Sequence, residues 1–278
     1  MRALGVALFS LLGIAGLPAA VSPASAAPSK FASSNDPSFH LVPMLDVPLL
    51  ALDAAVLLGL KAVVPQRHED GRLSDLFALD APVARNGRDD DALRTSDFGG
   101  LMAGAFALVD AIVTARHNDL DAGVITLGLY AESAMTTAAV TEVVKLLVQR
   151  PRPCTYQIDR RERPPLHCGQ DDDDAYLSFF SGHTAVTAAL STTATYLAFE
   201  RDADGSRAAW TVSGGLALTS FVAVERMRAG KHFPTDVITG AVVGAGIGFL
   251  VPHLHKGGAQ SATGLSSDGR MLTLASGF

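Results

Sequence analysis

Residues 122–153 read AGVITLGLYAESAMTTAAVTEVVKLLVQRPRP. The first 27 of these residues are mostly apolar, do not alternate with polar positions, and form a run too long for a β-strand. Ala, Leu and Val recur throughout it, and Pro151 and Pro153 then interrupt any helix. The stretch therefore predicts a long helix over Ala122–Val148 that ends in a basic, proline-containing turn.

Five further apolar segments have the same character. They are Leu41–Val64, Gly99–Thr114, Ala175–Phe199, Ala208–Val224 and Thr235–Leu254. A charged stretch, Pro65–Asp97, separates the first two of the six segments, and we interpret it as a surface excursion. The six segments together predict an all-α, single-domain bundle of about six core helices.

The composition excludes several classes of protein. The chain has 278 residues, of which 48% are hydrophobic and 18% charged, whereas a disordered polar chain would show the opposite balance. Its net charge of −6 argues against a nucleic-acid partner, because phosphate neutralisation requires a basic surface. Two cysteines are too few for a disulfide-dense miniprotein or a cysteine-ligated zinc module.

The amino-terminal residues have the features of a secretory signal. Arg2 precedes an apolar run, Ala3–Leu17, and small residues follow as far as Ala26. We expect a signal peptide over 1–26, a linker over 27–40, the main domain over 41–256 and a flexible tail over 257–278. Export would place the protein in the periplasm or outside the cell, where Cys154 and Cys168 can form a disulfide; two free thiols are the alternative.

Membrane insertion is the alternative to a soluble exported bundle. Several segments approach the length of about 17–20 residues that spans a bilayer, yet they carry acidic residues. The basic loops follow segments one, three and five, as they would in a membrane protein. That topology, however, would place both cysteines in a reducing compartment. We therefore prefer the soluble exported bundle and retain an integral membrane location as the alternative.

The first of three polar blocks contains Lys145 and Arg152, which are separated by six residues and followed by Pro153. A helix ending at the prolines would carry Lys145 about two turns before its end. Basic residues concentrated here, in an acidic protein, predict an anion pocket.

The second block is Ser181-Gly182-His183, at the beginning of an apolar run. A Ser–Gly pair at a helix start offers a hydroxyl and unblocked backbone N–H groups, aided by the helix dipole. His183 would project beside an anion held there.

The third block contains Arg226, His232 and Asp236. Pro234 suits the first turn of a helix, so His232 would precede that helix and Asp236 would lie in its first turn. A carboxylate at this spacing can hold one imidazole nitrogen and leave the other as a nucleophile or base.

The order and spacing of the three blocks resemble the type 2 phosphatidic acid phosphatase (PAP2) superfamily. This superfamily includes bacterial non-specific acid phosphatases, lipid phosphatases and vanadium haloperoxidases. The similarity covers about Lys145–Asp236, and the flanking segments suit the same six-helix plan.

The resemblance implies a phosphatase that acts on lipid or small-molecule phosphate monoesters. His232 would form a phosphohistidine, Asp236 would orient it, and His183 would protonate the leaving group and then activate water. The implied phosphate-binding residues are Lys145, Arg152, Ser181, Gly182 and Arg226. The chemistry requires no metal or other cofactor, and vanadate is expected to inhibit it.

Two positions depart from the family pattern. Phe180 stands where proline is usual and can line a substrate entrance, whereas Glu225 replaces serine and can pair with Arg226. The acidic run Asp171–Asp174 has a solvated loop as its default interpretation, with a weak calcium site or an anion-repelling gate as alternatives.

Two other functions remain open at the level of sequence. A vanadium-dependent haloperoxidase would use the same residues to hold vanadate as its cofactor. A non-catalytic, anion-binding envelope protein would need no pair such as His232 and Asp236. The sequence does not distinguish lipid from soluble substrates, and it does not predict an oligomeric state.

Overall fold

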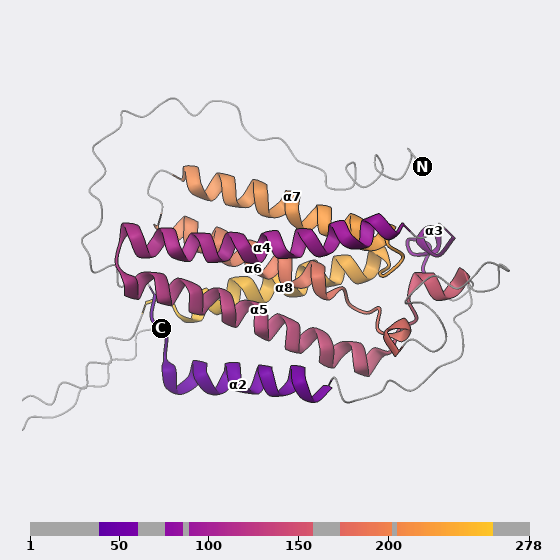
Figure 1. Cartoon of the computed structure of the whole chain (residues 1–278), viewed down its shortest axis with the longest axis horizontal. Coiled ribbons are helices and arrows are strands. Elements are labelled where there is room, and N and C mark those ends of the chain that lie inside the picture. The colour runs from indigo at the N-terminus through magenta and orange to yellow at the C-terminus, as the bar shows by residue number, and fades with distance from the viewer. Residues whose placement is uncertain (1–38, 61–75, 86–88, 158–172, 202–204, 258–278) are drawn as a thin grey trace, which may run out of the picture. The chain divides into compact units, whose positions relative to one another are not determined.

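The computed structural model describes residues 39–60, 76–85, 89–157, 173–201 and 205–257 (Figure 1). The α-helices are α2 (Pro43–Leu60), α3 (Ala81–Arg85), α4 (Asp90–His117), α5 (Leu120–Val148), α6 (Gly182–Arg201), α7 (Ser206–Arg228) and α8 (Pro234–Leu254). Two short 3₁₀ helices, η2 (Pro153–Gln157) and η3 (Asp173–Tyr176), lie between α5 and α6. The described residues contain no β-strand, which confirms the all-α prediction.

The six predicted helices are present; four begin within two residues of the predicted start, and two begin farther from it. Helix α4 begins at Asp90 because the side chain of Asp89 accepts hydrogen bonds from the backbone N–H groups of Asp91 and Ala92. The end of the stretch interpreted as a surface excursion is therefore helical. Helix α6 begins at Gly182, later than predicted, because η3 forms a separate turn before it.

Helix α6 is the central helix, in contact with α4, α5, α7 and α8 (Figure 1). Three glycines of α8, Gly240, Gly244 and Gly248, face its backbone. A Cβ atom on Gly244 would lie 1.9 Å from the carbonyl oxygen of Ala185, and one on Gly248 would lie 2.2 Å from that of Ala189. This close approach fixes α8 against α6 and brings their amino-terminal ends to the same end of the bundle.

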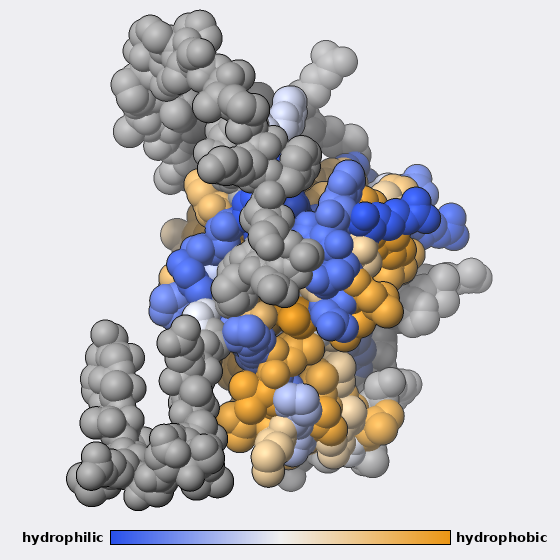
Figure 2. Space-filling model, turned by 90° about the vertical axis from the view of Figure 1, so that its left-hand side faces the viewer, coloured by the Kyte–Doolittle hydropathy of each residue, from blue (hydrophilic) through white to orange (hydrophobic). Residues whose placement is uncertain are grey.

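The outer helices direct small residues inward and large apolar residues outward. The buried positions of α4 are Ala92, Ser96, Gly99, Ala103, Ala107, Asp110, Ala111 and Thr114. Its exposed side chains include Phe98, Leu101, Phe106 and Val109. Figure 2 shows hydrophobic residues over a broad area of the surface. A water-soluble helix shows the reverse arrangement, whereas small residues between helices are typical of membrane bundles.

Four helices, α2, α4, α7 and α8, are long and apolar enough to cross a membrane. This finding favours the integral membrane alternative over the soluble bundle that the sequence analysis preferred. The predicted signal peptide, most of the linker and nearly all of the tail lie outside the described residues, so export and the domain boundaries stay predictions.

Candidate active site

The three polar blocks meet at one end of the bundle. Lys145 lies at the carboxyl end of α5, and Arg226 lies at that of α7. Ser181 and Gly182 begin α6 beside them, and His232 directly precedes α8. The positive charges of Lys145, Arg152 and Arg226 all act on His232.

His232 is fully buried, and its tautomer follows from one contact. The Nδ1 atom lies 2.7 Å from the carbonyl oxygen of Ser178, which can only accept, so Nδ1 carries the proton. The lone pair is then on Nε2. Burial lowers the pKa of His232 well below its usual value, as do the charges of Arg152 and Arg226. The imidazole is therefore neutral at neutral pH, with Nε2 able to act as a nucleophile.

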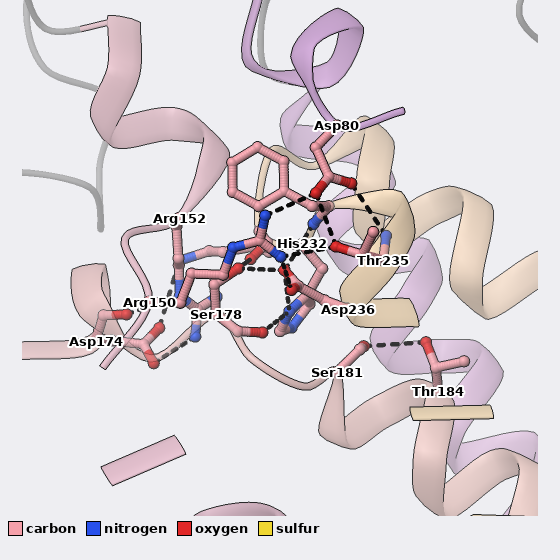
Figure 3. Close-up of polar contacts among 12 residues, drawn as sticks. Asp80, Arg150, Arg152, Asp174, Ser178, Ser181, Thr184, His232, Thr235 and Asp236 are labelled. Atoms are coloured by element: carbon pink, nitrogen blue, oxygen red, sulfur yellow. Dashed lines mark hydrogen bonds and ion pairs between the residues drawn. The ribbon is translucent and has the colours of Figure 1, made fainter. Parts of the chain in front are cut away.

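Asp236 holds the loop around His232 and makes no hydrogen bond to the imidazole. Its Oδ2 atom lies 3.9 Å from Nδ1 of His232, which is too long for a hydrogen bond. The same oxygen accepts from the Ser178 hydroxyl at 2.6 Å and from the Phe233 backbone N–H at 2.8 Å (Figure 3). The expected direct orientation of His232 by Asp236 is corrected: Asp236 positions Ser178, whose carbonyl holds the imidazole.

Arg150 extends this network through the hydrogen bonds of its guanidinium. Its guanidinium donates to Asp236, to the Thr235 hydroxyl at 2.8 Å and to Oδ2 of Asp80 at 2.7 Å (Figure 3). It also stacks over the ring of Phe233, 4.2 Å from the ring centroid. Asp80 is fully buried and also accepts from the Thr235 N–H. Sequence reasoning missed Asp80, because it falls in the charged stretch that was interpreted as a surface excursion.

Arg152 is buried and held by the last residue of the acidic run. Its Nε atom donates to the Asp174 carbonyl at 2.7 Å, and its Nη2 atom pairs with the Asp174 carboxylate (Figure 3). Lys231 lies 3.6 Å from that carboxylate. Burial raises the pKa of Asp174, but the charges of Arg152 and Lys231 outweigh it and lower the pKa overall. Asp174 is therefore an ionised support for Arg152.

Two buried nitrogen donors have no hydrogen-bond partner among the described residues. They are Nη1 of Arg152 and Nε of Arg226. The Nη1 atom of Arg226 donates to the Ser96 hydroxyl and to Asp97, both at 3.3 Å. A buried donor without a partner costs about 1–3 kcal/mol. The two arginines thus present donors that an anion would satisfy.

His183 lies at the mouth of the site, with 42% of its side chain exposed. Its Nε2 atom lies 3.0 Å from Oδ1 of Asp97, the same oxygen that pairs with Arg226. Asp97 therefore joins the predicted general acid to a predicted phosphate-binding residue. The sequence offered no signal for Asp97, because it is one of many acidic residues in its stretch.

The start of α6 leaves room beside a cation. A Cβ atom on Gly182 would lie 3.6 Å from Nζ of Lys145, so glycine keeps this space free. Lys145 itself pairs with Glu142 at 2.7 Å. The Ser181 hydroxyl lies 3.0 Å from the Thr184 hydroxyl, while its backbone N–H donates to the Asp236 carbonyl. The Ser181 N–H is thus occupied. The N–H of Gly182, by contrast, lies in the first turn of α6, where backbone donors have no partner within the helix.

Residues 126–258 match the family model described as the PAP2 superfamily. This region of the chain is therefore PAP2-like. This match confirms the resemblance inferred from the sequence and includes every predicted catalytic and phosphate-binding residue. No curated protein and no solved structure matches the chain. The match supports activity of the phosphatase or haloperoxidase type in general.

Three supporting residues come from outside the PAP2 match. Asp80 precedes α3, and Ser96 and Asp97 lie near the start of α4. Each contacts a residue inside the matched region: Asp80 holds Arg150, whereas Ser96 and Asp97 hold Arg226. The amino-terminal helices therefore complete the PAP2 site.

The two departures from the PAP2 pattern leave the phosphate-binding residues intact. Phe180 is buried and does not line an entrance, because it packs against α8 near Gly240. Glu225 pairs with Arg228 at 2.7 Å and accepts from the Thr95 hydroxyl at 2.7 Å, and it does not pair with Arg226. Its charge is therefore directed away from the anion pocket.

The predicted disulfide involves the turn that carries Arg152. Cys154 is fully buried in η2 and is disulfide-bonded. Cys168, its predicted partner, lies outside the described residues. Within the acidic run, Asp174 has the supporting role described above, and Asp171 and Asp172 also lie outside the described residues.

Proposed function

We propose that this protein is a metal-independent phosphatase that hydrolyses phosphate monoesters through a phosphohistidine. The observation that carries the proposal is the environment of His232: its Nδ1–H is held by the Ser178 carbonyl, and its lone pair is therefore on Nε2. The unpartnered donors of Arg152 and Arg226 supply the complementary positive charge. A nucleophile and an anion-binding shell are the two requirements of covalent phosphoryl transfer.

In the first half-reaction, Nε2 of His232 attacks phosphorus and the ester P–O bond breaks. The bonding electrons leave with the alkoxide, and His183 gives it a proton. Burial and the charge of Arg226 lower the pKa of His183 to about 4, so this donor is protonated mainly in acid. Arg152, Arg226, Lys145 and the Gly182 N–H stabilise the phosphoryl oxygens. The imidazole becomes positively charged as the P–N bond forms, and the Ser178 carbonyl holds its Nδ1–H throughout.

In the second half-reaction, His183 takes a proton from water, whose oxygen attacks the phosphohistidine. The P–N bond breaks, its electrons return to Nε2 of His232, and inorganic phosphate is released. Asp97 keeps His183 at the mouth of the site in both steps, because it contacts the Nε2 atom of that imidazole. The same His183 therefore serves as acid and then as base.

The surface supports a membrane location for this phosphatase. Four apolar helices present large hydrophobic side chains outward, and the polar site lies at the ends of α5–α8. A site at the end of a membrane bundle meets substrates at the bilayer surface. We therefore propose lipid phosphate monoesters as substrates ahead of soluble ones.

The test uses purified full-length protein in detergent with EDTA present. We expect hydrolysis of a chromogenic phosphate ester and faster hydrolysis of a lipid phosphate in mixed micelles. Vanadate should inhibit both reactions, and His232→Ala should abolish them. His253→Ala is the matched control, because His253 bonds Tyr196 at the far end of α8. Undiminished turnover by His232→Ala contradicts the mechanism, and equal rates on both substrates contradict the lipid preference.

A further inference from the structure

A second group of ionisable side chains lies far from the candidate active site. It consists of Asp46 in α2, Glu132 in α5 and His255 at the end of α8, and we call it the distal cluster. Asp236 and His255 are 19 residues apart along α8, which corresponds to about 28 Å. The distal cluster therefore cannot contact a phosphoryl group held by His232.

His255 presents one ring nitrogen to the two carboxylates. Its Nδ1 atom lies 2.7 Å from the carbonyl oxygen of Val251, so Nδ1 is the donor. Its Nε2 atom lies 3.3 Å from Oδ1 of Asp46 and 3.5 Å from Oε2 of Glu132. A backbone carbonyl that fixes the other ring nitrogen is the usual support of a metal-binding histidine.

The carboxylate oxygens are also oriented toward a common centre. Asp46 uses Oδ2 to accept from the Val42 N–H at 2.6 Å, which leaves Oδ1 facing His255. Glu132 is 5% exposed, and its Oε2 atom has no hydrogen-bond partner among the described residues. The three ligand atoms lie within 4.8 Å of one another. An unpaired buried carboxylate oxygen aimed at this centre calls for a cation.

The local charge balance points to the same conclusion. The charged groups that act on Glu132 within the described structure are His255, Asp46 and Asp53. The Asp46 and Glu132 carboxylates thus face one imidazole, and Asp53 adds negative charge nearby. Even a protonated His255 would leave the group with excess negative charge in a buried setting, whereas a divalent ion with neutral His255 neutralises Asp46 and Glu132.

We propose that the distal cluster binds one divalent transition-metal ion, with Zn²⁺ as the best fit. Zn–N and Zn–O bonds of about 2.0–2.2 Å at tetrahedral angles place ligand atoms about 3.3–3.5 Å apart. The distances from Nε2 of His255 to the two carboxylate oxygens, 3.3 and 3.5 Å, match this spacing. One nitrogen and two oxygen ligands from the protein leave a fourth position for water.

The ion would join three segments that are distant in sequence. Helix α2 packs against α5, and the distal cluster ties both to the end of α8. The proposed role is therefore structural: the ion fastens α2 to the bundle and takes no part in phosphoryl transfer. Sequence reasoning expected no metal, because the ligands are separated by 86 and 123 residues and form no local motif.

The test begins with untagged full-length protein in detergent that has been treated with a chelator and then freed of it. Zinc is added, and bound zinc and the thermal transition are measured. We expect one equivalent of bound zinc and a higher transition temperature. In Co²⁺-loaded protein we expect the intense visible absorption of a tetrahedral site. The proposal is overturned if the protein binds no zinc, or if the Co²⁺-loaded protein lacks the intense visible absorption.

Variants assign the ligands. Glu132→Gln and His255→Ala should each weaken zinc binding by at least about tenfold and remove the thermal shift. Asp53→Asn is the matched control, because Asp53 is a buried carboxylate of α2 that bonds Thr136 instead. His232→Ala must retain zinc binding, so failure of the catalytic proposal is distinguishable from failure of this one. Wild-type zinc affinity in both ligand variants overturns the assignment.

Discussion

The Nε2 atom of His183 lies 3.0 Å from Oδ1 of Asp97, and Nη1 of Arg226 lies 3.3 Å from the same oxygen. One carboxylate on α4 thereby positions a residue of α6 and a residue of α7. An imidazole at the mouth of the site needs such a partner, because 42% of its side chain is exposed. Asp97 is thus a positioning residue for the proposed general acid.

Asp97→Asn is expected to slow hydrolysis of alkyl phosphates by about 10–100-fold, which is part of the about 10²–10⁴-fold that general acid catalysis contributes. Activated aryl phosphates should lose much less, because their leaving groups need little protonation. The measurement is kcat for a series of esters with different leaving-group pKa values. A uniform loss across the series would show that Asp97 acts on folding or phosphate binding and not through His183.

Arg150→Met is expected to destabilise the protein by about 3–5 kcal/mol, because Asp80 and Asp236 would remain buried without their cation. Reversible unfolding in detergent measures the change. Lys256→Met is the control: its side chain is 44% exposed and pairs with Glu200, which is 26% exposed, so its loss should change stability far less. Equal effects for the two variants would contradict the structural role of Arg150.

The pH dependence follows from His232, whose pKa is lowered by burial and by Arg152 and Arg226. A group with a lowered pKa stays neutral until the pH falls below that pKa, so the nucleophile should remain active in mild acid. A plot of kcat/KM against pH should fall on the acid side only where the substrate phosphate itself becomes protonated, at a pKa of about 6. An additional limb at pH 6.5 or higher would contradict this assignment.

Gly244→Ala should separate α6 from α8, because the new Cβ would lie 1.9 Å from the Ala185 carbonyl oxygen. Overpacking of this kind costs about 1–3 kcal/mol or more and would displace the amino-terminal ends that carry the site. Thermal unfolding and kcat measure the two effects. Gly246→Ala is the control, since its Cβ would meet no described atom within 4 Å. A stable, fully active Gly244→Ala protein would contradict the proposed register.

The sequence was sufficient for the helices and for the three polar blocks that meet at one end of the bundle. Long apolar runs and the spacing of polar residues at their ends carry that information locally, as for Lys145 and Arg152. It was insufficient for Asp80 and Asp97, whose partners lie far along the chain. Acidic residues in a charged stretch have no periodicity that separates a buried support from a solvated side chain.

The structure favours the membrane alternative over the preferred soluble bundle, and part of the sequence argument against membrane helices has a physical answer. Acidic residues within apolar segments, such as Asp53 and Asp110, argued against membrane helices. In the structure both are buried against partners: Asp53 accepts from Thr136, and Asp110 accepts from Tyr130 and Arg207. Their burial removes the objection, while Phe and Leu side chains occupy the outer faces.

The most direct test of the central claim is to locate the covalent phosphate. In His183→Ala, an aryl phosphate should still phosphorylate the protein, since its leaving group needs little protonation, whereas loss of the base should slow hydrolysis of the intermediate. Alkaline quenching followed by peptide mass spectrometry should then find phosphate on His232. Phosphate on another residue, or steady turnover with His232 unmodified, would contradict the account.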